Sequence, residues 1–237
     1  MLGAVLFDLD GTLLDIDLDA FFREYFSALG PVIAEALDTG MDQRAGLDAV
    51  LQGTEAMSVP HPGRTNQEVF NERFREFTGA DLDLAEYALP FERFYAEVFP
   101  TLRGAMGPRA GARRAVLAAR DLGLPIVIAT NPIFPRAAIE ERIRWAGLED
   151  VPFSLVTTYE VMHATKPLAG YYLEVAEKIG VDANRCLMVG DDRMLDMPAS
   201  DVGMRTFYVG RPPVPSATWH GALEDLAELL PRLIRQD

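Results

Sequence analysis

A short apolar run near the N-terminus ends abruptly in acidic residues, and this junction constrains the fold more than any other stretch. Residues 4–7 have the length and the Val, Leu and Phe content of a buried strand, and Asp8, Asp10 and Gly11 follow at once. In an open α/β sheet the carboxyl ends of the strands face the ligand crevice. We therefore expect Asp8 and Asp10 to lie at a binding site, although an isolated Asp-x-Asp-Gly is also typical of a simple turn.

Two later apolar runs are followed by polar residues in the same way. The residues that follow them are Thr130 and Asn131 after the run 125–129, and Asp191, Asp192 and Asp196 after the run 186–189. Between the two runs Lys166, one of only two lysines in the chain, precedes Pro167 and a stretch with helical periodicity. Four groups of reactive residues thus follow one another in a fixed order.

This order resembles that of the haloacid dehalogenase superfamily. Its four motifs would correspond to Asp8 with Asp10, Thr130, Lys166, and Asp191 with Asp196. The resemblance covers residues 1–15 and 101–210. It implies an α/β fold with a Rossmann-like core, a mostly parallel sheet and an inserted, mostly helical cap of the type called C1.

The periodicity of the chain favours the same organisation. From residue 101 onward apolar runs alternate with helical stretches, which indicates a parallel sheet with right-handed crossovers. Residues 16–100 lack that alternation, so we expect a catalytic core of residues 1–15 and 101–237 and a cap domain of residues 16–100. In the cap we expect a first helix that begins at Asp17 or Asp19 as its cap, runs through Leu29 and is closed by Gly30 and Pro31. Further cap helices are expected at 32–37, 42–51, 66–77 and 89–98. In the core we expect strands at 125–130, 153–157, 186–191 and 206–209 and helices at 110–122, 136–146, 168–179, 223–233 and near 198–200.

Composition narrows the possible partners. The net charge of −14 argues against nucleic acid, because phosphate backbones are bound by an excess of Lys and Arg. No apolar run approaches the roughly 18 residues of a membrane span, and the N-terminus shows no leader pattern, so we expect a cytoplasmic protein without a membrane partner. Cys186, the one cysteine, falls in an expected buried strand and is predicted to be inert. We expect a monomer or homodimer.

The acidic residues predict metal-assisted phosphoryl transfer. A carboxylate becomes a competent nucleophile toward phosphorus when a divalent cation lies beside it, and Asp8 is our candidate for forming an aspartyl-phosphate. Asp10, two residues further, would serve as general acid and then general base, while its backbone carbonyl joins the metal shell. The resemblance implies that Asp191 completes the ligands of a Mg²⁺ ion, with Asp192 or Asp196 orienting them.

The phosphate itself requires positive charge and hydrogen-bond donors. Thr130, Asn131 and Lys166 are expected to bind the phosphoryl oxygens, and Lys166 also to keep Asp8 ionised. The polar loop 58–64 in the cap, which contains His61 and Arg64 between stiffening prolines, is a candidate specificity loop; an ordinary surface turn is the alternative.

Rival functions differ from this pattern at single residues. Dehalogenases proper lack the second aspartate, which is present here as Asp10, and phosphonatases use a cap lysine, whereas no lysine precedes Lys166. A sugar-phosphate mutase or another phosphotransferase of the superfamily is a further alternative. Mutases carry a histidine about where this chain has Ala20, which weakens this alternative without excluding it. A silent binding or regulatory module is the alternative of another class. We predict a phosphatase for a small phosphorylated metabolite, such as a sugar phosphate, a phosphoglycolate-like acid or a nucleoside monophosphate.

Overall fold

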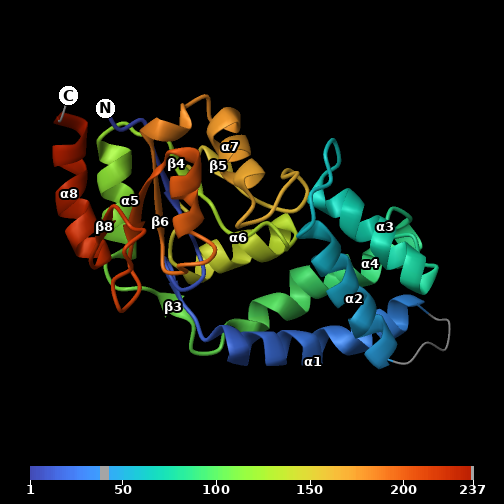
Figure 1. The fold of residues 1–237 in the computed structure, drawn as a ribbon. Coiled ribbons are helices and arrows are strands. Elements are labelled where there is room, and N and C mark those ends of the chain that lie inside the picture. Colours follow the sequence, from blue (N-terminus) through green and yellow to red (C-terminus); the bar gives the residue numbers. More distant parts are fainter. Residues whose placement is uncertain (38–42, 236–237) are drawn as a thin grey trace.

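A six-stranded, fully parallel sheet forms the centre of the core, and a group of helices lies to one side of this core (Figure 1). The computed structural model describes residues 1–37 and 43–235. The strand order is β5-β4-β1-β6-β7-β8. The strands are β1 (Ala4–Phe7), β4 (Ile126–Ile128), β5 (Leu155–Val156), β6 (Cys186–Gly190), β7 (Arg205–Tyr208) and β8 (Trp219–His220). The expected α/β fold with a mostly parallel sheet is confirmed.

Helices cover both faces of the sheet because its side chains alternate between two apolar layers. Val5 and Phe7 of β1 belong to one buried cluster, whereas Ala4 and Leu6 belong to another. The core helices are α5 (Ala112–Asp121), α6 (Arg136–Trp145), α7 (Ala169–Lys178) and α8 (Leu223–Arg235), with 3-10 turns at Ala183–Arg185 and Met197–Val202. Helices α5, α6 and α8 pack on the first cluster and α7 on the second, which leaves the strands buried on both sides.

A block of helices is inserted between β1 and β4, and we call it the helical insert (residues 18–103) (Figure 1). It contains α1 (Leu18–Leu37), α2 (Gln43–Met57), α3 (Asn66–Thr78), α4 (Ala85–Arg93), a π-helical turn (Phe94–Val98) and a 3-10 turn (Phe99–Arg103). The chain leaves the core through β2 (Leu14–Asp15) and returns through β3 (Gly107–Pro108), and these two strands pair antiparallel. This short pair, which the sequence did not predict, joins the insert to the sheet.

The first helix differs from the sequence prediction. Gly30 and Pro31 were expected to end a helix, but α1 runs through both to Leu37. Leu29 and Ile33 continue one buried face of the helix across the proline, and Gly46 of α2 lies directly against Ile33. The helix therefore continues because burial of this face outweighs the hydrogen bond that Pro31 cannot make.

Several other helices also begin or end at residues that differ from the sequence prediction. Helix α2 extends beyond the expected end at 51 to Met57, while the expected start at Asp42 lies outside the described residues. The helix expected at 89–98 ends as a regular α-helix at Arg93 and continues as a π-helical turn, and the short helix near 198–200 is a 3-10 turn. Strand β8 was not predicted, because two residues are too few to show periodicity.

The insert is held on the core at the N-terminus of α3. That helix begins with a capping box formed by Thr65 and Glu68, which fixes the position of Asn66. The buried Asn66 side chain donates to the Pro132 carbonyl at 3.0 Å, and its backbone N–H donates to the Met162 carbonyl at 2.8 Å. The backbone N–H of the next residue, Gln67, donates to the carbonyl of Tyr159 at 2.9 Å.

Within the described ranges, no helix has both the length and the apolar character that a membrane crossing requires.

Candidate active site

Three neighbouring strands end level with one another, and this brings the predicted site residues to one edge of the sheet. Phe7 of β1 lies opposite Ile128 of β4 and Val189 of β6. Asp8, Thr130 and Asp191, which follow these paired residues by one or two positions, therefore emerge at the same edge. The backbone supports the arrangement, since the Asp8 N–H donates to the Val189 carbonyl at 2.9 Å.

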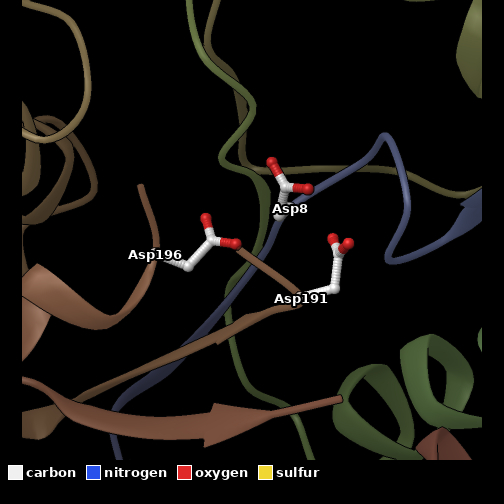
Figure 2. Close-up of side chains that lie close together, drawn as sticks. All are labelled: Asp8, Asp191 and Asp196. Carbon is white, nitrogen blue, oxygen red and sulfur yellow. The ribbon is translucent and has the colours of Figure 1, made fainter. Parts of the chain in front are cut away.

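Three carboxylates gather at this edge. Asp8, Asp191 and Asp196 each offer one oxygen, and these oxygens lie within 4.8 Å of one another (Figure 2). An all-carboxylate donor set suits a hard divalent cation such as Mg²⁺ and does not suit zinc, which prefers nitrogen and sulfur. Gly11, with a φ of 80°, lies directly against the Asp191 carboxylate, where a Cβ atom would collide with its oxygens. The residues present therefore fit a magnesium ion.

Lys166 lies at the centre of this negative charge. Its Nζ donates to Asp8 Oδ1 at 2.9 Å and to Asp196 Oδ1 at 2.6 Å, and the side chain is almost completely buried. Burial by itself would lower the pKa of Lys166, but the Asp196 and Asp8 carboxylates raise it well above its ordinary value. The two carboxylates therefore favour the charged form of Lys166, whose ammonium group holds Asp8 in position.

The two remaining acidic candidates of the fourth motif behave differently. Asp196 Oδ2 accepts from the Asp192 N–H at 2.9 Å, so that both oxygens of the buried Asp196 are in use. Burial raises the pKa of Asp196, and Lys166 opposes that rise. The Asp192 carboxylate accepts from the N–H groups of Met194 and Leu195 and thereby stabilises its own turn. Asp196 is thus part of the acidic cluster, whereas Asp192 lies outside it.

The residues after β4 are held by buried hydroxyl groups. Thr130 is buried, and its carbonyl accepts from Thr157 at 2.7 Å and from Tyr171 at 2.9 Å. The Asn131 side chain accepts from the Lys166 N–H at 3.1 Å. These contacts bring Thr130, Asn131 and Lys166 into one region beside Asp8.

Thr12 is a site residue that the sequence did not reveal. Its hydroxyl donates to Asp191 Oδ1 at 2.8 Å. Burial and the neighbouring Asp8 raise the pKa of Asp191, and the Thr12 hydrogen bond works against this. Thr12 follows the first motif directly, so its place in the turn after Asp10 and Gly11 was the available signal.

Arg142 is the second site residue that sequence reasoning missed. This buried residue of α6 forms an ion pair with Asp10 through Oδ2, while Asp10 Oδ1 and Arg142 Nη2 are buried without a hydrogen-bond partner. Burial raises the pKa of Asp10, and the Arg142 charge opposes the rise. The signal was an arginine on the same helical stripe as Ala138 and Trp145, where an apolar residue is expected.

In the predicted specificity loop, His61 and Arg64 make their side-chain contacts with the loop itself and with α3. His61 is buried, with Nδ1 at 2.6 Å from the Val59 carbonyl and Nε2 at 2.8 Å from Asn66 Oδ1. Arg64 forms an exposed ion pair with Glu72. The structure thus places His61 behind Asn66, where the insert meets the core.

We expect His61→Ala to destabilise the protein by about 1–3 kcal/mol, because it leaves Asn66 Oδ1 buried without its partner. Arg64→Ala, which removes an exposed ion pair, should cost about 0–1 kcal/mol. Urea unfolding of the two variants compares these values, and equal losses would contradict the buried role that we assign to His61.

The same two variants test the sequence prediction that residues 58–64 form a specificity loop. Their relative rates across a panel of phosphate esters are the measurement; if neither variant changes these relative rates, residues 58–64 are only a turn.

Comparisons with known proteins agree on one family. The family model described as haloacid dehalogenase-like hydrolase matches residues 2–200. A phosphoglycolate phosphatase of Neisseria gonorrhoeae is 32% identical over 195 residues, which cover 80% of this chain and 72% of that protein. A bifunctional riboflavin kinase/FMN phosphatase of Arabidopsis thaliana is 25% identical over 235 residues, which cover 96% of this chain and 54% of that protein.

The fold has relatives among solved structures. A haloacid dehalogenase-type phosphatase from Thermococcus onnurineus superposes with a TM-score of 0.60 at 21% identity, over 97% of this chain and 98% of that one. This likeness supports the Rossmann-like core with a helical cap. The family match over most of the chain confirms the resemblance that the four motifs carry. The chain belongs to the haloacid dehalogenase-like hydrolases and is a phosphatase-type enzyme of that family.

Proposed function

We propose that this enzyme is a Mg²⁺-dependent phosphatase that hydrolyses a small phosphate monoester through an aspartyl-phosphate. The observation that carries the proposal is the Asp8 carboxylate at the end of β1, paired with the buried Lys166 and surrounded by the other acids. A carboxylate that is fixed and kept ionised in this way is a suitable nucleophile for phosphorus. We further propose that residues 16–100 form a cap domain over this site.

In the first step a free oxygen of Asp8 attacks the phosphorus, and the bond to the leaving oxygen breaks. Thr130, Asn131 and Lys166 bind the phosphoryl oxygens, on which charge develops. Asp8, Asp191 and the Asp10 carbonyl, with Asp196 behind them, would hold a Mg²⁺ ion, which would supply further positive charge for the phosphoryl group. The acyl phosphate that results is then hydrolysed by water.

Asp10 is the proton carrier in both steps. Its Oδ2 is occupied by Arg142, but its Oδ1 has no hydrogen-bond partner in the structure. A buried carboxylate oxygen of this kind needs a partner, and the leaving oxygen of the substrate provides one. We assign to Asp10 Oδ1 the proton that the departing alkoxide receives and, in the second step, the proton that the attacking water gives up.

The metal requirement tests the proposal. We expect the purified protein to lose activity toward phosphate monoesters in excess EDTA and to regain it when Mg²⁺ is added beyond the chelator. Zn²⁺ should restore much less, because the donor set contains oxygen alone. Phosphate release is the measurement, and Asp192→Asn, in which only a turn loses its carboxylate, is the control that should keep the same Mg²⁺ response. Full turnover in EDTA would overturn the proposal.

A further inference from the structure

A large cavity lies between the helical insert and the segment that follows β4. Its volume is about 800 Å³, which lies within the range of about 300–1,000 Å³ for small-molecule sites. Eight of the lining residues are aromatic, among them Phe22 and Phe26 of α1, Phe70 of α3 and Phe91 of α4. An organic molecule with an extended apolar surface would be well accommodated there.

The cavity wall includes neighbours of the catalytic residues, although none of the described catalytic residues lines the cavity itself. Ile133, Phe134 and Pro135, which closely follow Thr130 and Asn131 in the chain, form part of its wall. The guanidinium carbon of Arg142 lies 4.5 Å from the centre of the Phe134 ring, and Arg142 pairs with Asp10. One aromatic ring therefore lines the cavity and also contacts the arginine behind the general acid. An ester whose leaving oxygen lies at Asp10 would therefore have to extend past Phe134 to place its organic part in this cavity.

The polar groups of the wall are mostly satisfied by one another. The hydroxyls of Tyr25 and Tyr95 bond to each other at 2.8 Å, and the Thr54 hydroxyl donates to the Val50 carbonyl at 2.9 Å. Groups that are paired in this way do not require polar atoms from a ligand. The cavity consequently selects for apolar surface.

The charge of the wall is negative. Among the described residues that line the cavity there is no lysine, arginine or histidine, and the charged ones are Glu92 and Glu160. Glu160 accepts from the Arg136 N–H at 2.8 Å through Oε1, whereas its Oε2 is buried without a partner. A ligand carboxylate would enter such a space without a counter-charge, which is costly. A ligand hydroxyl or N–H would instead satisfy Glu160.

We propose that the substrate is the phosphate monoester of a large, mostly apolar alcohol with an aromatic ring and without a carboxylate. This inference rests on the proposed phosphatase activity and names its substrate class. It separates this enzyme from relatives that are named for phosphoglycolate, whose organic part is a small acid. It also favours a hydrogen-bond donor on the ring system, within reach of Glu160.

Esters of primary alcohols test the preference without a large difference in leaving-group ability. We expect kcat/KM for 2-(2-naphthyl)ethyl phosphate to exceed the values for ethyl phosphate and for phosphoglycolate by about 10- to 100-fold, the gain that corresponds to burial of one large apolar group. A kcat/KM for phosphoglycolate that equals or exceeds the value for the naphthyl ester would overturn the inference.

Two tryptophan substitutions in α4 provide a matched pair. Ala88 lies on the cavity wall, whereas Ala85 is exposed on the same helix and does not line the cavity. We expect Ala88→Trp to lower the ratio of the naphthyl-ester to the ethyl-ester kcat/KM at least about tenfold, since it fills space that the ring needs. Ala85→Trp should leave the ratio as in the wild type. Thermal unfolding shows whether the Ala88→Trp protein is folded. An unchanged ratio in the folded variant would show that the naphthyl ring does not bind in this cavity.

Binding of the product alcohol separates this inference from the catalytic proposal. Calorimetric titration of the wild-type protein with 2-(2-naphthyl)ethanol requires no turnover, and Ala88→Trp should weaken the binding. If the alcohol binds and no ester is hydrolysed, the cavity assignment stands and the phosphatase proposal fails. If esters are hydrolysed without preference and the alcohol does not bind, the phosphatase stands and the substrate class is wrong.

Discussion

Asp8→Asn is expected to abolish turnover of every phosphate ester, with a loss of several orders of magnitude. The amide that replaces the carboxylate is not a nucleophile, so that the covalent route is closed. Lys166 keeps its second partner, Asp196, and the fold around it should therefore persist. Phosphate release measures the rate, and mass spectrometry of acid-quenched protein measures the phosphoenzyme.

The control for this substitution is Asp15→Asn, which changes an exposed aspartate of β2 in the same segment. Asp15→Asn should retain wild-type turnover. If Asp8→Asn kept a tenth or more of the activity, or still became phosphorylated, the nucleophile would have to be another residue.

Asp10→Asn should produce a loss that depends on the leaving group. The substitution keeps the backbone carbonyl that we assign to the metal and removes the proton carrier. General acid catalysis is typically worth about 10²- to 10⁴-fold in rate, and it matters most for a poor leaving group such as an alkoxide. We therefore expect that loss for alkyl phosphates, and a much smaller one in the first step for p-nitrophenyl phosphate, since a nitrophenolate leaves without a proton.

Rapid-quench kinetics with both substrates measures this difference. Because activation of water is also impaired in Asp10→Asn, aspartyl-phosphate should accumulate with the aryl substrate. Equal losses on both substrates without trapped phosphoenzyme would show that Asp10 serves the metal or the fold.

The strand ends could be predicted because they depend on local pattern and on topology alone. Apolar runs that stop at Asp8, Thr130 and Asp191 are visible in the sequence, and parallel strands of one sheet end at one edge. The register in the structure brings these three residues to that edge. The roles assigned to them, the cytoplasmic location and the oligomeric state stay predictions.

Contacts between distant residues could not be predicted in the same way. Arg142 and Asp10 are 132 positions apart, and helical periodicity marks Arg142 as buried without naming its partner. The predicted end of helix α1 was wrong for another reason. The rule that Gly30 and Pro31 end a helix is local, whereas the apolar face that carries the helix past them depends on α2. The cavity is likewise formed by several helices and loops that are far apart in the sequence, and no single stretch reveals it.

Two backbone amides at the N-terminus of α3 would report movement of the helical insert relative to the core. The amide protons of Asn66 and Gln67 belong to the first turn of their helix and are bonded instead to carbonyls of the core. Separation of the insert from the core would expose these two amides to water, while the interior amides of α3 stayed protected. Their hydrogen–deuterium exchange rates, compared with those of the rest of α3, would therefore give the free energy of opening. The same two amides would show whether a bound ester slows that opening.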